Sequence, residues 1–114
     1  MEARLVIANF RSDRLEEVEK ALRRIGVERI NVSKVKGFGE YHNYFSQNWL
    51  DLEARVEIFT KKEEVDAVTA AIMDAAYTGI VGDGVIAVVP IEKLYVIRTR
   101  SEATPENFWP RSAK

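Results

Sequence analysis

Hydrophobic and polar positions along the chain predict two units of the same design, each made of a strand, a helix and a second strand. In the first unit, the apolar run at residues 5–8 predicts a buried strand, and apolar residues at helical spacing over 15–25 predict an amphipathic helix. Gly26 is expected to end that helix, and the β-branched residues of 30–35 predict the second strand.

The second unit repeats this order after a long break in the pattern. Residues 54–59 alternate between apolar and polar as a half-buried strand does, and residues 65–76 carry the apolar stripe of a second helix. Gly79 is expected to end this helix. The apolar run at 85–89 predicts the last strand, which Pro90 should close.

Both helices are expected to begin at a capping box, in which a polar N-cap residue has its partner three positions later. Asp13 and Glu16 fit this pattern ahead of the first helix, and Thr60 and Glu63 fit it ahead of the second.

Three segments fall outside the two units. Residues 37–52 follow neither a helical nor a strand period and predict a long loop. Residues 94–97 predict a short extended piece, and residues 101–114 predict an aperiodic tail. We therefore expect one domain over residues 1–100, followed by a separate tail.

This order of elements predicts an α+β fold of the ferredoxin-like, split β-α-β type (βαββαβ). Two helices then cover one face of a four-stranded antiparallel sheet, and the other face is left bare. A chain of 114 residues buries a limited fraction of its surface. Neighbouring copies of the chain are the simplest cover for the bare face, so the pattern favours an oligomer.

Composition narrows the class of function. A formal net charge of −1 argues against a nucleic-acid-binding protein, and the absence of cysteine excludes disulfides and thiolate metal sites. The sequence has no nucleophile–histidine–acid motif and no dense carboxylate cluster, so we expect a binding protein and not an enzyme. The N-terminus is too charged for a signal peptide, and no apolar run approaches the roughly 18 residues of a membrane span. A cytoplasmic protein is the expectation.

Two segments carry the most specific chemistry. The sequence VKGFG at residues 35–39 opens the long loop, and TGIVGDGVI at residues 78–86 leads into the last strand, with Ile-Arg-Thr following at 97–99. In this order, on a split β-α-β frame, they resemble the PII signal-transduction family over about residues 1–100. An Asp-Gly pair taken alone would indicate only a turn.

The resemblance implies a homotrimer with an adenine-nucleotide site in each cleft between subunits. It also implies a T-loop at about residues 37–52, which contacts a partner protein, and a B-loop at residues 78–85. Glycines let backbone N–H groups approach phosphate oxygens, and arginine adds a charge-assisted contact. The residues that it assigns to nucleotide binding are Asn31, Gly37, Phe38, Gly39, Phe59, Thr78, Gly82, Asp83, Gly84, Val85, Arg98 and Arg100.

This chain departs from the family pattern where phosphates would bind. Glu40 and Tyr41 stand where members that bind Mg-ATP and 2-oxoglutarate carry arginine and glutamine. Ile80 and Val85 replace lysines of the B-loop, and Val96 replaces the first of two arginines near the C-terminus. We therefore expect ADP or AMP, ahead of ATP, as the ligand.

These departures are similar to those of the carboxysome-associated, bicarbonate-responsive branch. Bicarbonate is then a second candidate ligand, and the target is a transporter or a protein of carbon metabolism.

Two alternatives stay open: a structural or metal-tolerance trimer similar to the CutA proteins, and a weak nucleotide hydrolase in which Asp83 or Glu57 orients water.

The loop and the tail contain further candidates. Four aromatic residues between positions 41 and 49 of the loop, and Phe108 and Trp109 in the tail, suit either partner binding or packing within the protein. His42 is the single histidine, and zinc normally takes three or four ligands, so we expect no metal site and no other cofactor. The loop aromatics are Tyr41, Tyr44, Phe45 and Trp49.

Overall fold

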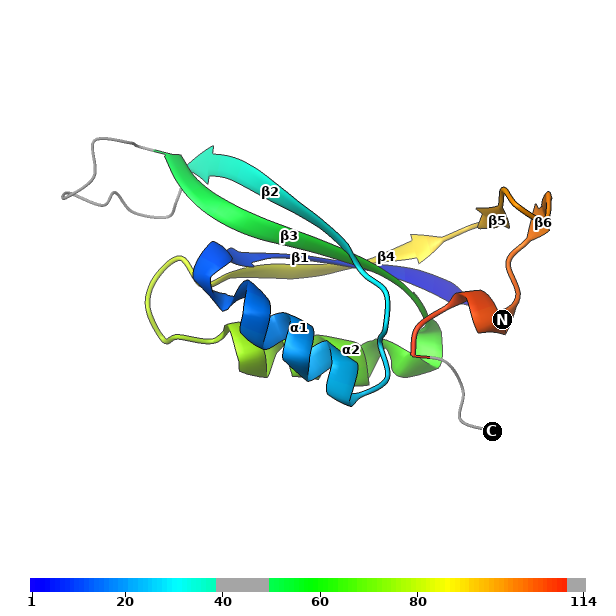
Figure 1. Ribbon diagram of the computed structural model, residues 1–114, viewed down its shortest axis with the longest axis horizontal. Helices are drawn as coiled ribbons and strands as arrows, with labels where there is room; N and C mark the ends of the chain where they lie inside the picture. The colour runs from blue at the N-terminus through cyan, green and yellow to red at the C-terminus, as the bar shows by residue number, and fades with distance from the viewer. Residues whose placement is uncertain (39–49, 111–114) are drawn as a thin grey trace.

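The computed structural model describes residues 1–38 and 50–110 and confirms the split β-α-β architecture (Figure 1). One antiparallel sheet has the strand order β2-β3-β1-β4, and both α-helices lie on the same face of it. The strands of this sheet are β1 (Ala3–Arg11), β2 (Asn31–Phe38), β3 (Leu50–Lys61) and β4 (Gly84–Ile91), and the helices are α1 (Leu15–Arg24) and α2 (Val65–Ala76). A small second sheet pairs β5 (Tyr95–Val96) with β6 (Ser101–Glu102), and three 3₁₀ turns are η1 (Ser12–Arg14), η2 (Lys62–Glu64) and η3 (Pro105–Asn107).

The core lies between the sheet and the two helices. Alternate residues of the central strands β1 and β3 point toward α1 and α2, as the period of a strand requires. The main buried residues are Val6, Ala8 and Phe10 of β1, Ala54, Val56 and Ile58 of β3, Val18 and Leu22 of α1, and Val68 and Ile72 of α2. Burial of these apolar side chains is what fixes the helices on the sheet.

Gly26 ends the first helix as predicted. Its φ is +93°, in the left-handed region that favours glycine. The N–H of Val27 donates to the carbonyl of Leu22 (3.0 Å), and the N–H of Gly26 donates to the carbonyl of Arg23 (3.0 Å). These two bonds form a Schellman motif, which satisfies carbonyl groups at the helix end.

Both capping-box predictions are wrong, because the preceding strands run further than their patterns indicate. Asp13 lies inside the 3₁₀ turn η1, and Arg14 is the N-cap of α1, without a capping hydrogen bond from its side chain. Thr60 belongs to β3, where it pairs with Arg4. Its side chain is buried, and among the described residues its hydroxyl has no hydrogen-bond partner.

Two other predicted ends are also displaced. Helix α2 ends at Ala76, and Tyr77 follows in an extended conformation, so Gly79 lies beyond the helix. Pro90 does not close the last strand but lies within β4, opposite Arg4. Among the described strands, β4 pairs with β1 alone and forms an edge of the sheet, where the missing N–H of a proline is tolerated.

The long loop is shorter than predicted at both ends. Gly37 pairs with Asp51, and Phe38 pairs with Leu50, so strands β2 and β3 extend into the segment 37–52.

The face of the sheet opposite the helices carries apolar side chains on β1 and β4. Leu5 and Ile7 share this face with Val85 and Val89 of the edge strand. Val85 is 65% exposed and Val89 is 40% exposed in the single chain. This half of the face is the surface that a second copy would be expected to cover.

Candidate functional site

The predicted nucleotide-binding residues fall into two groups at opposite ends of the sheet. Asn31 pairs with Glu57, whereas Gly37 pairs with Asp51 six residues further along β2. At about 3.3 Å per strand residue, these two positions are roughly 20 Å apart. The B-loop lies at the Gly37 end, and β5 and β6 lie at the other end (Figure 1).

The B-loop is held in shape by the side chain of Asp83. One carboxylate oxygen accepts hydrogen bonds from the N–H groups of Thr78 (3.0 Å) and Gly79 (2.9 Å). The other accepts from the Thr78 hydroxyl and from Nε of Arg11 (3.4 Å). Arg11 also donates to the carbonyl of Val81 (2.6 Å), so β1 and the loop are tied together.

These donors favour the ionised form of Asp83. The hydroxyl of Thr78, followed by the N–H of Thr78, lowers the pKa of Asp83 from 3.8 to about 2. The carboxylate is therefore charged at neutral pH and fills the concave side of the turn. Thr78 and Asp83 shape the loop, and this arrangement gives no support to a role for Asp83 in orienting water.

Two structural constraints require glycine in the B-loop: a positive φ angle and a close approach between two backbones. Gly82 and Gly84 both have positive φ, of +98° and +113°. At Gly84 a Cβ atom would also lie 2.0 Å from the carbonyl oxygen of Asn9, because the loop meets β1 there backbone to backbone. Only glycine allows this close approach.

A hollow of about 320 Å³ lies beside the B-loop. Its floor includes Asn9, whose side-chain oxygen is buried and has no hydrogen-bond partner in the part of the chain that the structure describes. The lining residues are Asn9, Phe10, Ile72, Met73, Ala76, Tyr77, Asp83, Gly84, Val85 and Ile86.

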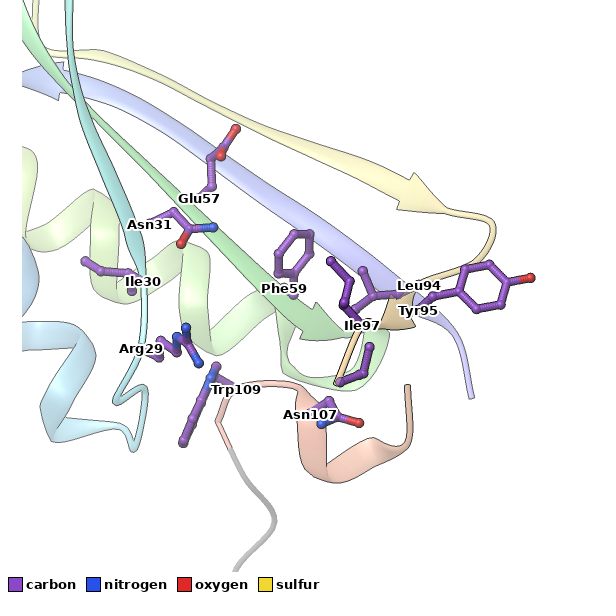
Figure 2. Close-up of a pocket in the computed structure, with 11 residues that line it drawn as sticks. Arg29, Ile30, Asn31, Glu57, Phe59, Leu94, Tyr95, Ile97, Asn107 and Trp109 are labelled. Carbon is purple, nitrogen blue, oxygen red and sulfur yellow. The ribbon is translucent and has the colours of Figure 1, made fainter. Parts of the chain in front are cut away.

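A larger cavity, of about 480 Å³, lies at the opposite end of the sheet. Figure 2 shows Asn31 and Phe59, both predicted from the sequence, together with Glu57 on neighbouring strands. Glu57 also forms an ion pair with Arg55 (3.4 Å). The lining residues are Arg29, Ile30, Asn31, Glu57, Phe59, Leu94, Tyr95, Val96, Ile97, Asn107 and Trp109.

Sequence reasoning did not place Arg29, Tyr95 or Asn107 at this cavity and left the role of Trp109 open. The pattern of β2 and β3 predicts which face a residue occupies, but Tyr95 and the tail come from aperiodic segments. The aromatic pair Phe108 and Trp109 was the signal that this part of the chain packs against the domain.

Arg98 and Arg100 lie in the exposed turn between β5 and β6. Arg100 has a φ of +53°, and its N–H donates to the carbonyl of Ile97 (3.2 Å). Both arginines are therefore at the cavity end of the molecule, far from the B-loop of the same chain (Figure 1). The structure does not bring the predicted phosphate-binding groups together within one subunit.

Several predicted residues lie outside the described residues. They are Gly39, Glu40, Tyr41, His42, Tyr44, Phe45 and Trp49. Gly37 and Phe38 are placed by their backbone pairing at the end of β2, the same end as the B-loop.

The described residues form no metal-binding cluster and no membrane-spanning helix. Over residues 1–38 and 50–110, no three His, Cys, Asp or Glu side chains are grouped so as to hold a metal ion. Within the same ranges, no helix has both the length and the apolar character needed to cross a bilayer.

The sequence is similar to those of known proteins from a single regulatory family. Residues 3–101 match the family model described as "Nitrogen regulatory protein P-II". The P-II homolog of Arabidopsis thaliana is 36% identical over 102 residues, which cover 82% of this chain and 52% of that protein. The chain thus spans about half the length of this relative. Nitrogen regulatory protein GlnK of Escherichia coli strain K12 is 32% identical over 104 residues, covering 84% of this chain and 92% of GlnK.

The fold agrees with the sequence match. The crystal structure of Arabidopsis thaliana PII bound to citrate superimposes with a TM-score of 0.77 at 33% identity, covering 90% of this chain and 89% of that one. Proteins of this family are regulators of signal transduction and not enzymes, which sets aside the hydrolase alternative. The chain belongs to the PII family of nitrogen regulatory proteins.

Proposed function

We propose that this protein is a homotrimeric PII regulator that binds an adenine nucleotide, ADP or AMP in preference to Mg-ATP, in the clefts between its subunits. The B-loop and the Gly37 end of β2 of one subunit contact the phosphates. The cavity of the neighbouring subunit holds the rest of the nucleotide, and Arg98 of that neighbour adds a charge-assisted contact to the phosphates. Occupancy of the cleft then changes how the T-loop leaves the sheet and so reports to a partner.

The observation that carries this proposal is the separation of the two groups of predicted residues. Asn31 and Gly37 are six residues apart on one strand, roughly 20 Å, and Arg98 lies in the turn between β5 and β6, at the opposite end of the sheet from the B-loop (Figure 1). One subunit therefore offers two half-sites. A ring of subunits that places the B-loop of each beside the cavity of the next completes every site.

The chemistry of each half supports the orientation of the nucleotide. The cavity has an amide at Asn31, a carboxylate at Glu57 and an aromatic side chain at Phe59, which suit a planar base with an amino group. The carboxylate would repel phosphates. The phosphates are therefore assigned to the glycine-rich end, where backbone groups come close to the ligand.

The preference for ADP or AMP over Mg-ATP follows from apolar residues at two B-loop positions where the family pattern has positively charged lysines. Val85, at the end of the B-loop, is apolar and 65% exposed, and Ile80 of the same loop is also apolar and exposed. Neither side chain can pair with a third phosphate. Glu40, at the base of the T-loop, adds a negative charge at the predicted γ-phosphate position.

We propose that the protein responds to inorganic carbon. Bicarbonate is a small anion that backbone N–H groups beside the phosphates could bind. The Arabidopsis PII structure is bound to citrate, which is also an anion, and this supports a second, anionic ligand. The target would be a transporter or a protein of carbon metabolism, contacted by the aromatic residues of the loop, which include Tyr41 and Trp49.

Calorimetric titration of the purified protein with ADP, AMP and Mg-ATP, each with and without bicarbonate, tests the proposal. We expect ADP or AMP to bind at least as tightly as Mg-ATP. Arg98→Ala should weaken ADP binding roughly ten- to hundredfold, because a hydrogen bond to a charged group contributes about 1.5–3 kcal/mol. Tight binding of Mg-ATP alone would contradict the nucleotide preference, and unchanged binding by Arg98→Ala would remove this residue from the site.

A further inference from the structure

The ordered chain continues past the region that matches the family. The family model ends at residue 101, but the structure describes the chain to residue 110. The N–H of Ala103 donates to the carbonyl of Leu94 (2.8 Å), and the N–H of Trp109 donates to the carbonyl of Phe59 (3.0 Å). Phe108 is only 1% exposed. The tail is therefore attached to β3 and to the segment before β5.

The attached tail forms part of the larger cavity. Trp109 and Asn107 line it together with Phe59 and Asn31 (Figure 2). The indole of Trp109 is half-buried, packed on one side against the core. Its backbone bond to β3 holds the residue at the edge of the cavity whatever its side chain does.

The cavity has the size and character of a small-molecule site. Its volume of about 480 Å³ lies within the range of roughly 300–1,000 Å³ that is usual for ligand pockets. Aromatic side chains and a few polar groups share its wall. Aromatic rings bind planar bases by stacking, because every base presents a π-face.

We propose that Trp109 is a base-contacting residue: its indole forms one wall of the pocket for the adenine ring. This inference rests on the proposed function, since the base must first be in this cavity. It adds a wall that the matched family region, which ends at residue 101, does not contain. It also links nucleotide binding to the tail, because a ligand against Trp109 holds residues 103–110 in place.

A purely structural role for Trp109 makes a different prediction about substitutions. Trp109→Phe keeps an aromatic face, whereas Trp109→Leu keeps apolar bulk without one. If the side chain only packs against the core, the two variants should bind ADP alike. If it stacks on the base, only the leucine variant should lose affinity.

The test is calorimetric titration with ADP of the full chain, its Trp109→Phe variant and its Trp109→Leu variant, after melting curves without ligand. Stacking contributes enough for its loss to weaken binding roughly ten- to hundredfold. We expect that loss in Trp109→Leu and a change below about threefold in Trp109→Phe. Equal affinity of the two variants overturns the inference about Trp109. Failure of the unmodified protein to bind ADP, AMP or Mg-ATP overturns the proposed function itself.

A fluorescence measurement covers the case in which Trp109→Leu does not fold. The chain contains two tryptophans, so Trp49→Phe leaves Trp109 as the single indole. Its emission should change with ADP, and half of the change should be reached at the dissociation constant that calorimetry gives for the same variant. Unchanged emission at saturating ADP contradicts contact between the base and Trp109.

Discussion

Asp83 accepts hydrogen bonds from both the backbone N–H and the side-chain hydroxyl of Thr78, five residues earlier in the chain. The carboxylate thus occupies the inside of the glycine-rich turn, where backbone N–H groups would otherwise be open to a phosphate. The turn is preorganised by its own charged residue. Because this carboxylate takes up the backbone donors of Thr78 and Gly79, we expect a phosphate to contact the outside of the turn.

Substitution of Asp83 by asparagine should change the pH dependence of stability. The folded-state pKa of Asp83, about 2, is below its ordinary value of 3.8. The ionised carboxylate therefore stabilises the fold above about pH 4, and this contribution is lost as pH falls toward 2. Asp83→Asn should lower the free energy of unfolding at pH 7 and weaken its dependence on pH between about 4 and 2. Urea unfolding at several pH values measures both effects.

A second substitution separates Asp83 from other acidic groups. Thr78→Val removes the hydroxyl that contributes most to lowering the pKa of Asp83. The pKa of Asp83 should rise toward its ordinary value, so the loss of stability with acid should become smaller and be complete at a higher pH. An identical acid profile in all three proteins would show that this network does not stabilise the fold.

Gly84→Ala should be strongly destabilising. The added Cβ would meet the carbonyl oxygen of Asn9 at 2.0 Å, and φ at this position is +113°. We expect the free energy of unfolding to fall by more than about 3 kcal/mol, beyond ordinary backbone strain. Gly26→Ala is the matched control, because φ is +93° there but the nearest atom is 3.5 Å away. It should lose only about 1–2 kcal/mol, and equal losses would argue against a close approach at Gly84.

Val85→Lys should tighten nucleotide binding, and should do so most for Mg-ATP. The side chain is exposed at the end of the B-loop, where the family pattern has a lysine. A new charged hydrogen bond to phosphate would improve affinity roughly tenfold or more. Val32→Lys adds the same charge on β2, at an exposed position that lines neither hollow. If both variants tighten binding equally in calorimetry, net charge and not the B-loop position is responsible.

The tail should contribute to the stability of the domain. Phe108 is almost fully buried, so Phe108→Ala should cost about 3–5 kcal/mol in thermal or urea unfolding. Lys20→Ala, on the exposed side of α1, should change stability by less than about 0.5 kcal/mol. A small effect at Phe108 would mean that the tail detaches in solution.

Residue patterns predicted the architecture well, because it depends on repeated burial. Val6, Ala8 and Phe10 alternate, and Val18 and Leu22 recur at helical spacing, so the strand and the helix are both readable. Thr60 is a residue whose local sequence pattern predicted the wrong structure. Its capping-box pattern is genuine in the sequence, but pairing with Arg4 keeps it inside β3. Pairing between β1 and β3 determines where β3 ends, and the local sequence around Thr60 does not indicate it.

The candidate site was only partly predictable for a related reason. Gly84 and Asp83 lie in a compact motif and were recognisable. Trp109 reaches the cavity through an aperiodic tail, and only the three-dimensional path of residues 103–110 places it beside Phe59. Periodicity carries no information about a single half-buried aromatic residue in such a segment.

The central claim is that each nucleotide site is shared between two subunits, and mixed trimers test it most directly. Arg98→Ala damages one half-site, and Val85→Glu, which adds a charge that repels phosphate, damages the other. Light scattering should first establish that each variant and their mixture are trimeric. Each variant alone should bind ADP weakly.

After the two variants are unfolded together and refolded in equal amounts, their subunits should combine at random. Calorimetry should then recover tight ADP binding in roughly a quarter of the sites, because half of the B-loops are intact and half of these face an intact Arg98. The recovered sites should have the affinity of the unmodified protein. A mixture that binds ADP no better than its two parents would contradict a site shared between subunits.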